Sequence, residues 1–218
     1  TFLLISSLFF LWALCNGMID VMDKHFQDFL HLSKRESAWV QFAHYLGYFL
    51  MALPAGWFAN KLGYKGGIIA GLVIVAAGCL WFIPATSIST FWAFLLGVCV
   101  ISMGLTFLET VANPYTTVLG PENYAATRIN IAQSFNGVGW ILGPIIGGLF
   151  FYSEQGAQAA HQTLWIPYTG IAAVVLLLAC VFWFVRLPEI KPPEDAVTAA
   201  AASHGGISIW SRPHFVMA

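Results

Sequence analysis

The sequence predicts an all-α membrane protein with six transmembrane helices, and two observations support this prediction. Hydrophobic residues make up 59% of the 218 residues and charged residues only 9%, with a mean hydropathy of +0.76. A soluble domain carries about 25% charged residues and could not bury so much apolar surface. The apolar residues also fall into runs of about 20, the length that a helix needs to cross the hydrocarbon core of a bilayer.

Six such runs follow one another along the chain. They predict a bundle over residues 1–186, with helices at about 2–22, 37–59, 66–85, 91–112, 129–152 and 164–185. The connection 23–36 is long and polar, and 60–65 is short and basic. Residues 187–206 are rich in Pro and Ala without apolar periodicity, which is typical of a linker.

Residues 207–218 become apolar again, so we expect a seventh helix to start there. The chain also lacks an initiator Met, and its first residues lack the features of a signal peptide. We therefore expect a piece of a longer protein, whose second membrane bundle is missing.

Positively charged residues are biased towards one side of the predicted membrane. Connections on the side of the N-terminus carry Lys61, Lys65, Arg128, Arg186 and Lys191, whereas the opposite side carries Lys24, Lys34 and Arg35. Because cytoplasmic loops carry an excess of Lys and Arg, we expect the N-terminus and the linker to be cytoplasmic. The expected location is the cell (inner) membrane, with several passes.

Several function classes find no support in the sequence. The net charge of −1 argues against a nucleic-acid partner. The four cysteines lie in apolar runs without metal-ligand spacing, so we expect no metal site. HExxH, GxSxG and Walker-type motifs are absent from the sequence, so we predict neither an enzyme nor an ATP-driven pump.

Glu109 is the first charged residue after a stretch without charge from Gly66 to Leu108. A charge at the bilayer centre costs about 2.5–3.5 kcal/mol, so this carboxyl is expected to face protein or a water-filled cavity. It could be structural, but it could also carry a proton and accept a hydrogen bond from a sugar hydroxyl. Asn113 shares its helix face, and Pro114 either opens the helix beside a cavity or ends it.

Further polar residues share helix faces elsewhere in the apolar runs. Asn16 and Asp20 repeat the spacing of four on the first helix, although Asp20 could also be an interfacial residue. Gln133 and Asn136 lie three apart on the fifth helix, where amides either bind a polyol or join helices. The second helix presents Gln41, His44 and Tyr48 on one face, and a lone His is more often a hydrogen-bonded core residue.

Four stretches resemble the fucose:proton symporter family of the major facilitator superfamily. They are SLFFLWALCNGMID, QFAHYLGYFLMALPAGWFANKLGYKGGI, LETVANPYTTVLGP and RINIAQSFNG, and the resemblance covers essentially all of residues 1–186. It implies that this chain is the N-terminal half of a twelve-helix fold, in which each six-helix half is a 3+3 inverted repeat. The site then lies near the membrane midplane between the halves, and transport proceeds by alternating access.

The resemblance also implies roles for individual residues. Proton coupling falls on Asp20 and Glu109, and sugar contacts fall on Glu109, Gln133 and Asn136, to which the polar positions above add Asn16, Asn113 and Gln41. The family's asparagine pair in the first helix is only half kept, as Asn16-Gly17. The superfamily's loop between helices two and three corresponds to Gly56, Asn60, Lys61, Gly63 and Lys65, with Asn60 where an acidic residue usually stands.

These observations lead us to expect a proton-coupled symporter for L-fucose or a related hexose. Protons would be the coupling ion and no other cofactor is expected. The expected partners are the sugar, the lipid bilayer and the missing C-terminal half, in a monomer. The run GxxxGPxxGG from Gly139 to Gly148 resembles a motif of proton-driven drug antiporters and keeps that alternative open. A six-helix membrane enzyme or channel is the third alternative.

Overall fold

The computed structural model describes residues 1–29, 32–151 and 165–188, and residues 1–187 form one compact unit. The elements of the described residues are α1 (Phe2–Phe29), α2 (Lys34–Ile88), α3 (Phe91–Val118), the short 3-10 helix η1 (Glu122–Tyr124), α4 (Ala125–Phe151) and α6 (Trp165–Phe184). All of them are helical, which confirms the predicted all-α class. Almost all of the predicted linker 187–206, and the predicted helix start at 207–218, lie outside the described residues.

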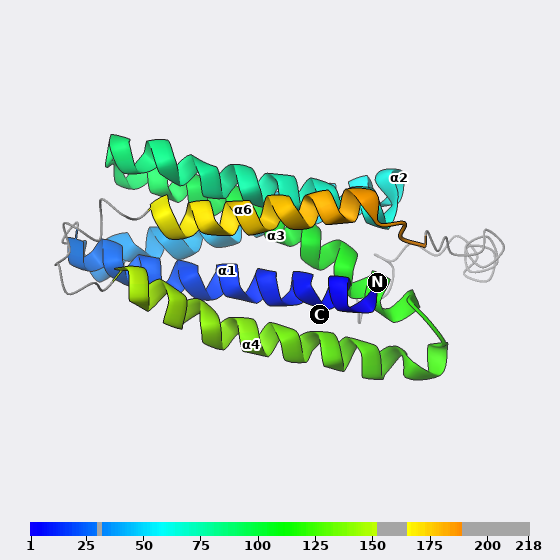
Figure 1. Ribbon diagram of the computed structural model, residues 1–218. Helices are drawn as coiled ribbons and strands as arrows, with labels where there is room; N and C mark the ends of the chain where they lie inside the picture. Colours follow the sequence, from blue (N-terminus) through cyan, green and yellow to red (C-terminus); the bar gives the residue numbers. More distant parts are fainter. Residues whose placement is uncertain (30–31, 152–164, 189–218) are drawn as a thin grey trace, which may run out of the picture. The chain divides into compact units, whose positions relative to one another are not determined.

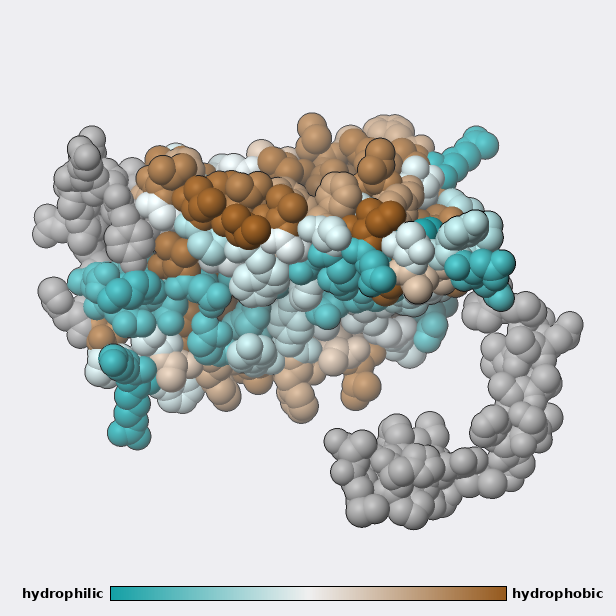
Figure 2. Space-filling model, turned by 90° about the horizontal axis from the view of Figure 1, so that it is seen from below, coloured by the Kyte–Doolittle hydropathy of each residue, from teal (hydrophilic) through white to brown (hydrophobic). Residues whose placement is uncertain are grey.

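The long helices of this unit run alongside one another (Figure 1). Helix α2 packs against α3 and α6, and α1 packs against α4. Within the described residues, α1, α2, α3 and α6 are long and apolar enough to cross a membrane. Apolar side chains outside the core are abundant, and on the face that Figure 2 shows, a band of hydrophilic to neutral residues runs between hydrophobic areas.

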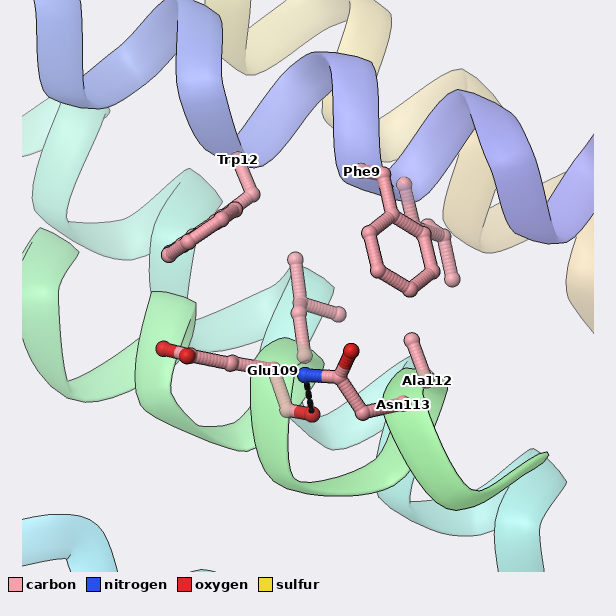
Figure 3. Close-up of a pocket in the computed structure, with 7 residues that line it drawn as sticks. Phe9, Trp12, Glu109, Ala112 and Asn113 are labelled. Atoms are coloured by element: carbon pink, nitrogen blue, oxygen red, sulfur yellow. Dashed lines mark hydrogen bonds between the residues drawn. The ribbon is translucent and has the colours of Figure 1, made fainter. Parts of the chain in front are cut away.

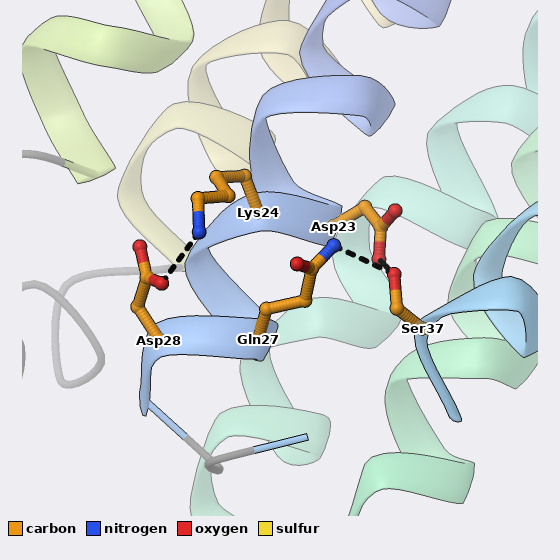
Figure 4. A network of polar contacts seen from close by, with 5 residues as sticks. All are labelled: Asp23, Lys24, Gln27, Asp28 and Ser37. Atoms are coloured by element: carbon orange, nitrogen blue, oxygen red, sulfur yellow. Dashed lines mark hydrogen bonds and ion pairs between the residues drawn. The ribbon is translucent and has the colours of Figure 1, made fainter. Parts of the chain in front are cut away.

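Helix α1 continues to Phe29 and does not end at residue 22, so the expected connection 23–36 is much shorter. Its last turns carry polar side chains that form hydrogen bonds with α2, as Figure 4 shows. The Ser37 hydroxyl donates to Asp23 Oδ1 at 2.6 Å and accepts from Gln27 Nε2 at 2.8 Å. Lys24 also pairs with Asp28 at 2.7 Å. The two bonds of Ser37 fasten the end of α1 to the start of α2, whereas the Lys24–Asp28 pair lies within α1.

Helix α2 contains two of the predicted segments, 37–59 and 66–85, and the expected loop 60–65 is reduced to a kink at Gly63. Gly63 has φ 71° and ψ 178°, a backbone conformation that glycine adopts without steric cost. Ser33 and Glu36 begin the helix with a reciprocal capping box. The left-handed Ser89 ends it, so the turn into α3 is only two residues long.

Helix α3 runs four residues past Pro114, so the proline does not end the helix. Arg128, near the start of α4, binds the chain that follows this end. Its guanidinium donates to the carbonyl oxygens of Thr116 at 3.1 Å, of Thr117 at 2.5 Å and of Pro121 at 2.9 Å. The bonds to Thr116 and Thr117 satisfy carbonyls in the last turn of α3 that have no intrahelical partner, and the bond to Pro121 fixes the turn into α4.

The contact between α1 and α4 depends on glycines of the predicted small-residue run. A Cβ added at Gly139 would lie 2.8 Å from Ala13 Cβ and 3.0 Å from the Leu14 nitrogen, and closer still to the Phe10 carbonyl oxygen. A Cβ at Gly143 would lie 2.7 Å from the Leu14 carbonyl oxygen. The two backbones therefore approach one another more closely than any side chain would allow.

We predict that Gly139→Ala destabilises the full-length protein by about 2 kcal/mol, because the added methyl meets backbone that cannot move aside. Gly137→Ala and Gly170→Ala are matched controls, since an added Cβ there meets nothing within 4 Å of this chain. All three variants gain the helix propensity of alanine. Thermal unfolding in detergent measures the difference, and equal stability of all three would contradict the packing described here.

Candidate functional site

Glu109 and Asn113 lie beside a small cavity between α1 and α3 (Figure 3). The cavity has a volume of about 10 Å³, room for about one water molecule. Asn113 Nδ2 donates to the backbone oxygen of Glu109 at 3.0 Å. The Glu109 carboxylate extends below the ring of Trp12. The cavity is lined by Leu8, Phe9, Trp12, Leu108, Glu109, Ala112 and Asn113.

This position shows why the apolar segment accepts a carboxylate. Glu109 is half-buried against α1, and its neighbours Leu108 and Ala112 are buried. Pro114 has no N–H to donate to the carbonyl of Thr110, so the helix lacks one backbone hydrogen bond here. A polar side chain at membrane depth is tolerated where it faces protein or a cavity, as Glu109 does.

Tyr48 joins α2 to α1 at the same level of the bundle. Its hydroxyl oxygen accepts from Trp12 Nε1 at 2.5 Å and from Asn16 Nδ2 at 3.5 Å. Both partners can only donate through these nitrogens, so the Tyr48 O–H remains available to donate.

Asn16 has a second polar atom in the same place. The residue is only 5% exposed, and its Oδ1 has no hydrogen-bond partner among the described residues. A buried acceptor without a partner is rare in proteins and calls for a ligand or water. Tyr48 and Asn16 are linked to the cavity beside Glu109 through Trp12, which lines the cavity and donates to the Tyr48 hydroxyl.

Asp20 and Gln41 form a separate pair near the end of α1. Gln41 Nε2 donates to Asp20 Oδ1 at 3.0 Å, and Asp20 is exposed whereas Asn16, one turn earlier, is buried. The structure therefore brings together the predicted Asp20 and Gln41, and separately Glu109 and Asn113 with Asn16 nearby. The exposure of Asp20 is compatible with the interfacial alternative as well as with proton exchange with water.

The two amides of α4 are not equivalent. Asn136 is buried against α1 and its Nδ2 lies 3.5 Å from the carbonyl oxygen of Phe9, whereas Gln133 is exposed. Asn136 thus joins α4 to α1. The side chain of Gln133 is exposed and therefore accessible to a ligand. Neither amide lines the cavity beside Glu109.

Gly17 occupies the place of the second asparagine that the family resemblance implies. A Cβ added there would lie 2.8 Å from Pro144 Cδ and 3.4 Å from the Cα of Gly143. Helix α4 therefore leaves no space for an amide at this position, and Asn16 supplies the only side chain of the pair.

The predicted conformational loop lies around the kink of α2. Lys61 Nζ lies 4.0 Å above the ring of Trp57, a cation–π geometry. Lys65 Nζ donates to the carbonyl oxygens of Trp183 at 2.7 Å and Val185 at 3.0 Å, at the end of α6. Gly56 and the exposed Asn60 lie on the turns before the kink, and a Cβ at Gly56 would meet nothing within 4 Å.

A family model described as Major Facilitator Superfamily matches residues 1–217. The chain belongs to this superfamily. It is 38% identical over 97% of its length to the L-fucose-proton symporter of Escherichia coli (strain K12), and 31% identical over 98% to the glucose/galactose transporter of Brucella abortus (strain 2308). It spans 52% of each relative, about half the length of the curated relatives it matches.

The solved structures agree with this membership. The crystal structure of the major facilitator transporter FucP in the outward conformation matches with a TM-score of 0.73 and 35% identity, over 96% of this chain and 56% of that chain. The resemblance to fucose:proton symporters that the sequence motifs indicated is thereby confirmed.

Sequence reasoning did not place two residues of this site. Tyr48 was seen only as part of a helix face, although its spacing from Gln41 and His44 already indicated a polar strip. Ser102, which is fully buried in α3 and binds His44, gave no signal because a serine in an apolar run is commonplace.

We predict that Tyr48→Phe destabilises the protein by about 1–3 kcal/mol, because it leaves the donors of Trp12 and Asn16 without an acceptor. Tyr45→Phe is the control, since Tyr45 is 66% exposed on the same helix. The comparison is made by thermal unfolding of the full-length variants. Equal midpoints for the two variants would show that the Tyr48 hydroxyl does not hold α1 to α2.

Proposed function

We propose that the full-length protein is a proton-coupled symporter for a monosaccharide, L-fucose or a related hexose, and works by alternating access. The observation that carries the proposal is the half-buried Glu109 beside Trp12, which binds Tyr48, together with Asn16 Oδ1, which has no partner among the described residues. A sugar hydroxyl both donates and accepts, so such a set of groups suits it. The names of the relatives, an L-fucose-proton symporter and a glucose/galactose transporter, support the same substrate class.

Protons are the proposed coupling ion, and the proposal includes no other cofactor and no enzymatic step. Glu109 couples the two substrates because moving a bare carboxylate through a medium of low dielectric is costly. The protonated carboxyl passes more easily, so the sugar-loaded carrier reorients with Glu109 protonated and the proton enters with the sugar. The exposed Gln133 contributes a sugar contact that the second half of the protein completes.

The proposed location and orientation in the membrane rest on membership of the Major Facilitator Superfamily and on the distribution of Lys and Arg. The protein spans the cell (inner) membrane as a monomer, with the N-terminus and the linker in the cytoplasm, as the bias of Lys and Arg indicates. Residues beyond 187 connect this bundle to a second one, which supplies the other half of the sugar site.

The alternative of a drug antiporter rests on the glycine run of α4. In the structure, Gly139 and Gly143 pack against the backbone of Phe10 and Leu14. Close helix packing accounts for the spacing without any antiport function. The symporter is therefore the function that the geometry supports best.

The direct test uses energy-depleted cells that contain the full-length protein. L-fucose, glucose, galactose, mannose and N-acetylglucosamine are added in turn while the external pH is recorded. Alkalinisation with one sugar is the expected result, because each sugar molecule enters with a proton. Silence with every sugar, in cells shown to contain the protein, would contradict the proposal, and acidification would favour an antiporter.

We predict that Glu109→Gln abolishes this alkalinisation while sugar binding is retained. Glutamine keeps the shape and the hydrogen-bonding groups of the protonated acid but cannot exchange a proton. Glu122→Gln is the matched control, because Glu122 is an exposed carboxylate in η1. Undiminished sugar-linked proton uptake by Glu109→Gln would remove Glu109 from the coupling mechanism.

A further inference from the structure

His44 is a titratable residue that the proposed mechanism leaves unused. It lies on α2 between Gln41 and Tyr48, one turn from each, and is half-buried. Its Nδ1 lies 2.7 Å from Ser102 Oγ, and Ser102 is fully buried in α3. This short hydrogen bond to a buried serine fixes the orientation of the imidazole ring, whichever of the two atoms donates the proton.

The backbone explains why this bond forms. One turn after His44, a Cβ added at Gly47 would lie 2.8 Å from Ser102 Cβ and closer still to the Cys99 carbonyl oxygen. Helices α2 and α3 thus approach closely at this level. A larger residue at 47 would separate the helices and move Ser102 out of reach of the imidazole.

His44 lies on α2 between two residues that contact α1. On one side, Gln41, one turn earlier on α2, donates to Asp20 Oδ1 at 3.0 Å. On the other side, the centroid of the His44 ring lies 5.0 Å from that of Tyr48, whose hydroxyl accepts from Trp12 Nε1, and the Glu109 carboxylate extends below the Trp12 ring. The polar groups therefore continue along the seam of α1, α2 and α3.

The titratable neighbours of His44 in the described part of the chain lie on all three helices. Asp20 on α1 binds Gln41, one turn from His44; the rings of Tyr45 and Tyr48 on α2 contact the imidazole; and the half-buried Cys99 lies one turn before Ser102 on α3. Asp20 is the carboxylate among them, and no lysine or arginine is in this set.

We propose that His44, oriented by Ser102, is a proton-transfer residue that links Asp20 to Glu109. The role rests on the proposed proton-coupled sugar transport. A proton that Asp20 takes up from outside moves to the imidazole, which leaves Asp20 as a carboxylate and His44 as an imidazolium. The imidazolium then releases a proton towards Tyr48 and Glu109, with water as the carrier, and returns to its neutral form. The second step converts the Glu109 carboxylate into the acid.

The test compares His44→Gln, Ser102→Ala and the control Tyr45→Phe in the full-length protein. Two activities are measured per molecule of inserted transporter: exchange of labelled sugar at equal pH on both sides, and sugar-linked proton uptake across a range of pH. Exchange requires no net proton transfer, so it reports binding and reorientation alone. Tyr45 contacts the ring of His44 but is exposed, so Tyr45→Phe controls for a change beside the imidazole.

We expect His44→Gln to slow proton uptake by at least about tenfold and to leave exchange unchanged, because glutamine fills the site but carries no exchangeable charge. Ser102→Ala keeps the imidazole but frees its orientation, so its uptake falls less and its pH profile shifts. Tyr45→Phe behaves like the wild type.

Two outcomes would overturn the proposal. If His44→Gln retains both the rate and the pH profile of proton uptake, His44 transfers no proton. If exchange falls together with uptake in inserted protein, His44 is a structural residue. A wild-type protein that exchanges sugar without any proton uptake would contradict the symporter proposal itself, so the two failures can be told apart.

Discussion

The constraint on which this bundle depends is the cost of polar groups in a solvent without water. Each buried polar atom must find a partner inside the protein, so the few polar side chains gather where helices meet. The Tyr48 hydroxyl accepts hydrogen bonds from Trp12 and Asn16. Ser102 forms a hydrogen bond with His44, and Asn136 donates to the Phe9 carbonyl. The same contacts that satisfy these groups hold α1, α2, α3 and α4 together. Asn16 Oδ1 stays unsatisfied among the described residues, and it lies where a ligand is expected.

Close helix packing makes these polar contacts between helices possible. Gly139 and Gly143 allow the backbone of α4 to contact that of α1, and Gly47 allows the same between α2 and α3. Short polar side chains reach across such contacts, whereas wider spacing would leave them facing lipid or a void. The same closeness carries a restriction, because Pro144 excludes any larger residue at Gly17. The number of amides that α1 can offer to a sugar is therefore set by the packing of α4.

Much of the fold could be predicted from the sequence, because apolar runs of membrane-spanning length leave few alternatives. The pairing of Glu109 with Asn113 followed from their spacing of four. The end of α1 could not be predicted, since Asp23 and Gln27 look like loop residues until Ser37 of α2 is placed beside them. The sequence also did not reveal that a kink at Gly63 replaces the expected loop. One residue with a positive φ is enough to change the direction of the helix there. The different environments of Gln133 and Asn136 depend on the rotation of α4 against α1, which no local pattern encodes.

In the proposed mechanism, Glu109 couples the energy of a proton gradient to sugar transport. Its most direct test is sugar accumulation in proteoliposomes that contain the purified full-length protein. The internal concentration of the transported sugar is measured with and without an imposed pH gradient, acidic on the side of the first connection. The account predicts accumulation above the external concentration only when the gradient is present, and its collapse when a protonophore is added. Equilibration to the same concentration under both conditions would contradict proton coupling and identify a uniporter.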